Sequence, residues 1–256
     1  MPDHFRSPHL RIGRAEHHIR DLKREIDGWV NEKPWARTIE VDPNGLFKEY
    51  KLKLTRNITD AASVIVADAI TSLRSALDQC GAAAARASGI SKPKKAYFPF
   101  APDPEGVMNS AKGWSKDVPP DIVTLMCSFK PYETGNPLLW AISRIRNVDD
   151  HFLLRPMTLS APVISIMSAT GVFNTPGSTL VFPGVFDNEV TYFRGPVTMP
   201  DFEHELDIRL DVAFGEVDVV SGKPAFTILG HMLSMTTRIV DIIETETRRL
   251  FPNAFV

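Results

Sequence analysis

The residues best suited to chemistry lie near the end of a predicted helix that starts at Asn136 and Pro137. Asn136 can cap this helix, and Pro137 suits its first position. An apolar stripe at helical spacing follows, and Asp149 lies on the same stripe: Leu138, Ile142, Ile145 and Phe152. An acid on a buried stripe needs a partner, so the polar residues around it form the candidate site: Arg146, Asn147, Asp149 and His151. Among these groups, a guanidinium can grip phosphate oxygens and an imidazole titrates near neutral pH.

The segment Arg146-Asn-Val-Asp-Asp-His151 resembles the Arg-x4-6-His motif of the HEPN superfamily, whose ribonuclease members often carry Asn, Asp or His after the arginine. The resemblance implies a helical bundle, usually dimerised so that two motifs face one cleft. It also implies metal-independent RNA cleavage, with His151 as general base on the 2′-hydroxyl and Arg146 stabilising phosphate charge. On a regular helix these two side chains lie about 140° apart, so the helix must bend before His151 for them to act together.

A second resemblance covers more of the chain. The segments Ser72-Leu-Arg-Ser-Ala-Leu-Asp78, Tyr97-Phe-Pro-Phe100 and Asn147-Val-Asp-Asp-His151 are similar to a family of bacterial proteins of uncharacterised function. That family carries Leu-Arg-Ser-Ala-Leu-Asp on one helix and Asn-x-x-Asp-Lys-His-Arg later in the chain. Here an aspartate replaces the lysine and a phenylalanine the final arginine, which lowers the local positive charge. The resemblance implies a polar cluster in which Arg74 meets Asp149, with Asn147 and His151 beside them.

The same residues also have structural interpretations. Arg74 and Asp78 are four residues apart and can pair along their own helix. A buried pair of Arg74 with Asp149 can fix helix register without any catalytic role. The lysine-rich run Ser91-Lys-Pro-Lys-Lys-Ala-Tyr97 is either a solvated loop or a phosphate contact. A metal site at Asp149, Asp150 and His151 is disfavoured, because consecutive helical residues point apart.

Composition narrows the functional classes. With 29 basic and 31 acidic residues the net charge is -2, so no global field attracts nucleic acid or an anionic membrane. Two cysteines in helical apolar patterns, Cys80 and Cys127, are expected to be buried free thiols of a reducing compartment. We find no signal peptide and no run of about 18 apolar residues, so the expected location is cytoplasmic, without membrane contact. No phosphate-binding glycine loop, nucleophile elbow or zinc pattern is present, so no cofactor is expected.

Helical periodicity and turn signals predict the elements that position these residues. Helices are expected over 7–29, 59–88, 120–127, 136–151 and 224–250. Extended runs over 35–41 and 46–54 flank Asp42-Pro-Asn-Gly45 and predict a β-hairpin. Residues 91–104 contain four prolines and read as an ordered loop, in which Tyr97, Phe98 and Phe100 need burial.

Between residues 157 and 220 the spacing of apolar residues changes from that of helices to the two-residue alternation of strands. Residues 205–214 alternate apolar and polar without a break, and weaker strands are expected over 163–167, 179–182 and 190–193. The predicted fold class is therefore α+β, with a helical bundle, an N-terminal hairpin and an antiparallel β-meander inserted before the last helix. A single domain of 1–256 is expected, its helical part being 1–155 plus 222–250.

Two functional hypotheses follow from the sequence. In the first, the protein is a non-enzymatic bacterial protein whose polar cluster organises a bundle that presents a partner or ligand face. In the second, it is a HEPN-like ribonuclease that uses Arg146 and His151. A homodimer through the helical bundle is the expected assembly, and RNA is a partner only under the second hypothesis.

Overall fold

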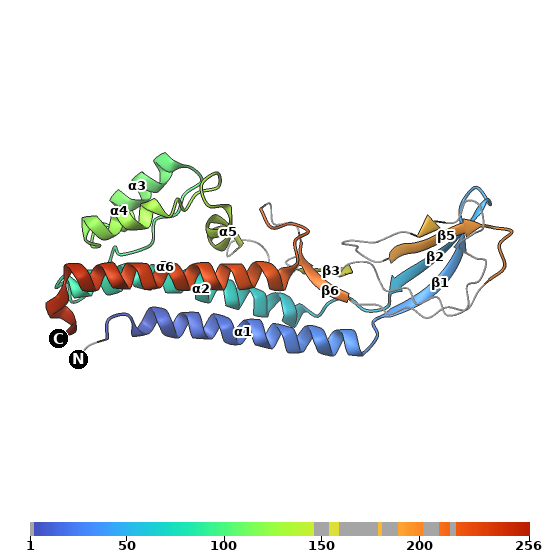
Figure 1. The fold of residues 1–256 in the computed structure, drawn as a ribbon, viewed down its shortest axis with the longest axis horizontal. Helices are drawn as coiled ribbons and strands as arrows, with labels where there is room; N and C mark the ends of the chain where they lie inside the picture. The colour runs from blue at the N-terminus through green and yellow to red at the C-terminus, as the bar shows by residue number, and fades with distance from the viewer. Residues whose placement is uncertain (1–2, 146–153, 159–178, 181–188, 202–209, 216–218) are drawn as a thin grey trace.

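Three long helices form the body of the protein. The computed structural model describes residues 3–145, 154–158, 179–180, 189–201, 210–215 and 219–256. Helices α1 (Arg6–Asn31), α2 (Asp60–Ala87) and α6 (Ala225–Leu250) lie side by side along most of their lengths (Figure 1). Both termini lie at one end of this bundle, and a short 3₁₀ helix, η2 (Pro252–Phe255), follows α6. The predicted α+β fold class is confirmed.

The middle helix, α2, supplies much of the core. Thr59 caps it, because its side-chain oxygen accepts a hydrogen bond from the Ala62 amide at 3.3 Å. Its apolar stripe is fully buried: Val66, Ile70, Leu73, Leu77 and Cys80. Beyond it, small residues allow close packing, and a Cβ added at Gly81 would collide with the Ala96 carbonyl oxygen. The loop after α2 therefore returns in direct contact with the helix backbone.

Three shorter helices pack on one side of α2 and α6 (Figure 1). They are α3 (Pro104–Trp114), α4 (Pro120–Ser128) and α5, described over Pro137–Ile145. Asn136 caps α5 as predicted, since its Oδ1 accepts a hydrogen bond from the Leu139 amide at 3.1 Å. Helix α3 was not expected, because it contains two glycines and buries only Val107 and Ala111. Asp103 starts it by accepting a hydrogen bond from the Gly106 amide at 2.7 Å.

A four-stranded antiparallel sheet projects beyond the far end of the bundle (Figure 1). Strands β1 (Trp35–Val41) and β2 (Phe47–Leu54) form the predicted hairpin, and β5 (Glu189–Pro196) and β4 (Thr179–Leu180) extend it in the order β1-β2-β5-β4. Strands β3 (Leu154–Thr158) and β6 (Leu210–Phe214) pair separately. The inserted strands thus divide between two sheets, and β5 joins the hairpin. The expected strand 163–167 and residues 205–209 lie outside the described residues.

The hairpin turn is organised by Asp42. Its Oδ1 accepts hydrogen bonds from the Leu46 and Phe47 amides at 2.8 and 2.9 Å, and Gly45 takes the left-handed conformation with φ +69°. These backbone donors, Phe47 first, lower the pKa of the Asp42 carboxyl. The sequence signal Asp42-Pro-Asn-Gly45 therefore acts as predicted.

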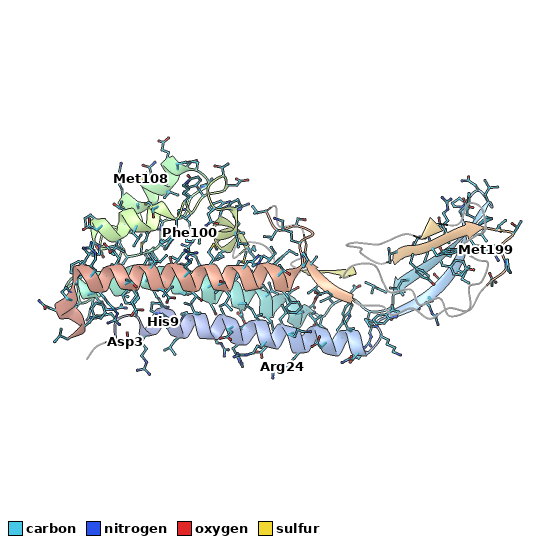
Figure 2. The ribbon with its side chains drawn as sticks, viewed as in Figure 1. Asp3, His9, Arg24, Phe100, Met108 and Met199 are labelled. Atoms are coloured by element: carbon cyan, nitrogen blue, oxygen red, sulfur yellow. The ribbon has the colours of Figure 1, made fainter. Side chains whose placement is uncertain are left out.

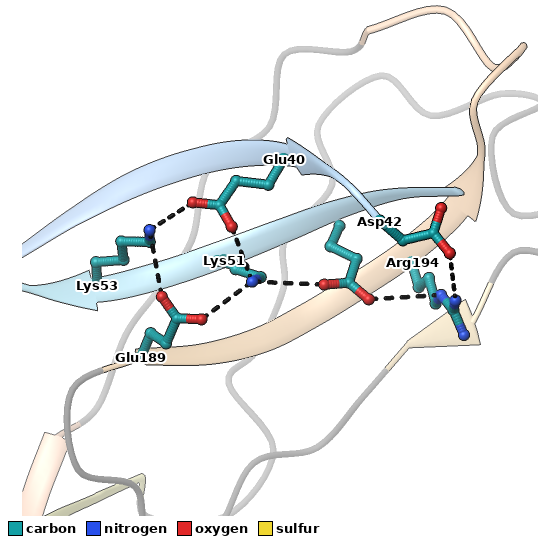
Figure 3. A network of polar contacts seen from close by, with 7 residues as sticks. Glu40, Asp42, Lys51, Lys53, Glu189 and Arg194 are labelled. Carbon is teal, nitrogen blue, oxygen red and sulfur yellow. Dashed lines mark hydrogen bonds and ion pairs between the residues drawn. The ribbon is translucent and has the colours of Figure 1, made fainter. Parts of the chain in front are cut away.

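Opposite charges alternate along one face of this sheet (Figure 3). The Lys51 Nζ lies 2.8 Å from a Glu40 carboxylate oxygen and 3.0 Å from a Glu189 oxygen, and Lys53 bridges the same two acids. Side-chain hydrogen bonds from Lys51 and Lys53 lower the pKa of Glu40 to about 2. The opposite face carries a separate apolar cluster: Tyr50, Leu52, Tyr192, Phe193 and Met199.

Helix α6 is long and apolar enough to cross a membrane by length and composition alone. Its buried residues follow helical spacing, among them Leu229, Met232, Ile239 and Ile243. They belong to the same apolar core as α1 and α2, which is the arrangement of a bundle helix.

The close approach at Gly81 gives a stability prediction. Gly81→Ala should lower the free energy of unfolding by about 1–3 kcal/mol, because the methyl group meets a backbone carbonyl that cannot rotate away. Gly13→Ala in α1 is the matched control, because a Cβ there meets nothing within 4 Å. It should raise stability by roughly 0.5–1 kcal/mol through helix propensity. Urea unfolding measures the free energy of unfolding of both variants. Equal changes for Gly81→Ala and Gly13→Ala would contradict the close contact at Gly81.

The charged sheet face gives a pH prediction. The folded pKa of Glu40 lies near 2, below its usual 4.5. Its stabilising contribution is therefore complete above pH 4.5 and is lost as the pH falls towards 2. A carbon-13 NMR titration should give a Glu40 pKa of about 2, and Lys51→Met should move it towards 4.5. An unchanged pKa in that variant would show that Lys51 does not hold the carboxylate.

Candidate functional site: the Arg74 cluster

Arg74 and Asp78 lie one turn apart on α2 and form a two-pronged ion pair. Arg74 Nε and Nη2 each donate to an Asp78 carboxylate oxygen at 3.2 Å. The two side chains are 14% and 17% exposed, so the pair is largely removed from water. The interpretation that these residues pair along their own helix is confirmed.

The loop after α2 completes the surroundings of this pair. The Phe98 amide donates to Asp78 Oδ1 at 3.1 Å, and the Phe100 ring centroid lies 3.8 Å from Arg74 Cζ. Figure 2 shows Phe100 on the same side of the long helices as α5. Phe98 is buried and Phe100 half-buried as predicted, but the predicted burial of Tyr97 is wrong, because its side chain is 45% exposed.

Helix α5 supplies the third side of the cluster. Arg74 Nη1 donates to Ser143 Oγ at 3.0 Å, so one guanidinium joins α2, the loop and α5. We call Arg74, Asp78, Phe100 and Ser143 the Arg74 cluster. Ser143 was not singled out from the sequence, because a serine on a helix carries no signal for a distant arginine.

The remaining predicted site residues follow Ser143 in the sequence. Arg146, Asn147, Asp149 and His151 fall outside the described residues, which end at Ile145 and resume at Leu154. The pairing of Arg74 with Asp149 therefore stays a prediction. What the structure adds is position: Ser143, three residues before Arg146, touches Arg74.

The hydrogen bonds of the Arg74 cluster join neighbouring elements of the fold. All three guanidinium nitrogens of Arg74 donate to neighbouring side chains, and Asp78 Oδ1 accepts from both Arg74 and the Phe98 amide. Each carboxylate oxygen of Asp78 therefore accepts at least one hydrogen bond within the protein. Burial and hydrogen bonding are thus balanced, as a largely buried ion pair requires.

Other reactive groups of the described chain lie in unreactive settings. Both cysteines are free thiols, Cys80 buried and Cys127 half-buried, and burial raises the pKa of each, that of Cys80 well above its usual value. Such thiols are poor nucleophiles. Within the described residues, no three His, Cys, Asp or Glu side chains are placed to hold a metal ion.

An open groove of about 370 Å³ lies between α4 and α6. It is lined by Leu125, Arg238, Asp241, Ile242, Thr245 and Glu246. The Glu246 carboxylate is already paired with Arg249 at 2.7 Å. We assign no chemistry to this groove.

Comparisons with protein-family models, curated proteins and solved structures give no match. They therefore test neither of the two resemblances drawn from the sequence.

Removing the Arg74 side chain should lower the stability of the fold. Arg74→Ala leaves the Asp78 carboxylate largely buried and without its counter-charge, and should lower the free energy of unfolding by about 3 kcal/mol. The double variant Arg74→Ala/Asp78→Ala should lose less than the sum of the two single losses. Lys23→Ala is the control, since Lys23 pairs with Asp27 at the same spacing on an exposed surface and should change little. If Arg74→Ala and Lys23→Ala lowered the free energy of unfolding equally, the role assigned to Arg74 would be contradicted.

Proposed function

We propose that the protein is a non-enzymatic binding protein in which the Arg74 cluster holds a loop and a short helix rigidly against the bundle. The observation that carries the proposal is the engagement of the Arg74 guanidinium, whose three nitrogens each donate a hydrogen bond while its Cζ lies over the Phe100 ring. A group so engaged serves to join elements, whereas a catalytic group must be able to reach a substrate.

The loop that the Arg74 cluster holds in place has the features of a binding surface. The loop of residues 91–100 is anchored to α2 through the Phe98 amide, yet its Tyr97 side chain faces solvent. A rigidly held loop with an exposed aromatic side chain is suited to recognition, because little conformational entropy is lost on binding. The cluster thus stabilises a surface instead of performing a reaction.

The ribonuclease alternative predicts a different outcome for the 146–151 segment. In it, His151 and Arg146 would cleave RNA, and the adjoining contact between Arg74 and Ser143 would only orient their helix. Under our proposal, these polar residues extend the structural cluster begun by Arg74.

An RNA cleavage assay separates the two. Purified wild-type protein should leave a generic single-stranded RNA intact, and His151→Ala should lower the melting temperature by several degrees, because a member of the polar network is removed. His231→Ala is the control, since His231 is exposed on α6 and its removal should leave the melting temperature unchanged. Cleavage that disappears in a folded His151→Ala or Arg146→Ala variant would overturn the proposal.

A further inference from the structure

An exposed aromatic pair lies next to the anchored loop. Tyr97 from the loop and Trp114 from the end of α3 are 45% and 59% exposed, and their ring centroids lie 6.2 Å apart in an edge-to-face arrangement. The Lys95 Nζ sits 5.5 Å from the Trp114 ring centroid. We call Lys95, Tyr97 and Trp114 the aromatic platform.

Backbone hydrogen bonds fix the platform in place. The Tyr97 amide donates to the Trp114 carbonyl at 3.1 Å, and the buried Ser115 hydroxyl donates to the Tyr97 carbonyl at 2.6 Å. Asp117 Oδ2 accepts from the Lys94 and Lys95 amides, both at 2.8 Å. The two exposed rings are therefore presented by a rigid backbone and do not depend on collapse onto an apolar core.

Lysines are frequent on the two segments that carry the platform. Lys92, Lys94, Lys112 and Lys116 are exposed on these segments, and Lys95 is half-buried. Among the described residues, no acidic side chain forms an ion pair with any of these lysines. Asp117 is occupied by backbone amides, which, Lys95 first, lower the pKa of its carboxyl, and Asp103 and Glu105 lie at the opposite end of α3.

We propose that the aromatic platform binds single-stranded nucleic acid, with bases stacking on Trp114 and Tyr97 and the surrounding lysines neutralising phosphates. Flat rings held at an angle, with cations on both flanking segments, match a ligand that alternates π-faces with negative charges. An acidic peptide offers the charge without the regular π-faces, and an anionic bilayer requires no fixed ring geometry. This inference rests on the proposed binding function and names its ligand.

The platform is coupled to the Arg74 cluster through the chain itself. Tyr97 and Phe100 are three residues apart, so their Cα atoms are separated by at most about 10 Å. Phe98 between them bonds Asp78, and Phe100 stacks on Arg74. The buried ion pair thus sets the position of the loop from which Tyr97 emerges.

Binding can be tested by fluorescence anisotropy with labelled poly(dT) and poly(U) strands of about 12 nucleotides and with a duplex of equal length. Wild-type protein should bind both single strands at low salt and the duplex more weakly. Trp114→Ala should raise Kd about tenfold, whereas Trp114→Phe should retain most of the affinity through stacking. Lys94→Gln/Lys95→Gln should flatten the dependence of log K on log salt by about 0.7 for each phosphate that is no longer neutralised. Lys223→Gln, an exposed lysine before α6, is the matched control and should change neither quantity.

Three results would overturn the inference. They are absence of single-strand binding by the folded wild type, binding that Trp114→Ala leaves unchanged, and Trp114-dependent binding of polyglutamate or phosphatidylserine vesicles that equals or exceeds oligonucleotide binding. Circular dichroism of each variant shows whether the fold is intact. Failure here leaves the non-enzymatic proposal standing, whereas RNA cleavage dependent on His151 would remove that proposal and leave the platform as a binding surface.

Discussion

A single largely buried guanidinium determines how the smaller elements sit on the bundle. Arg74 lies on α2 at 14% exposure, so its charge and its donors have to be satisfied by protein atoms. Asp78 supplies the counter-charge from the same helix, Phe100 covers the guanidinium, and Ser143 of α5 accepts a hydrogen bond from Nη1. The loop and α5 must therefore keep the positions that they occupy. If either moved away, a buried donor would be left unsatisfied or a buried ring face would meet water.

The loop between α2 and α3 is held in place by these contacts and exposes an aromatic surface. It is fixed to α2 at Phe98, packs its backbone against Gly81, and is tied to the end of α3 through Asp117. With these contacts made, Phe98 turns inward and Tyr97 turns outward beside Trp114. The same loop thus contributes Phe100 to the buried Arg74 cluster and Tyr97 to the exposed aromatic platform, which links stability of the bundle to the proposed binding role.

The parts of the structure that depend on local signals could be predicted from sequence. The cap at Asn136 and the hairpin turn at Asp42 are short-range effects, and each is found where the sequence places it. The joining of β5 to the hairpin depends on contacts more than a hundred residues apart, which alternation of residues does not encode. Arg74 was identified through the resemblance to the uncharacterised bacterial family and through its four-residue spacing from Asp78. Ser143 and the exposure of Tyr97 follow only from how the loop and α5 pack.

Hydrogen exchange at the Phe98 amide tests the central claim most directly, because that amide bonds the Asp78 carboxylate of the Arg74 cluster. Arg74→Lys keeps the charge but cannot make the forked pair or the planar stack on Phe100. We expect the variant to exchange faster at Phe98 and along α5, while the amides of α1 keep their wild-type rates. Unchanged exchange in both segments would contradict the view that Arg74 holds them in place.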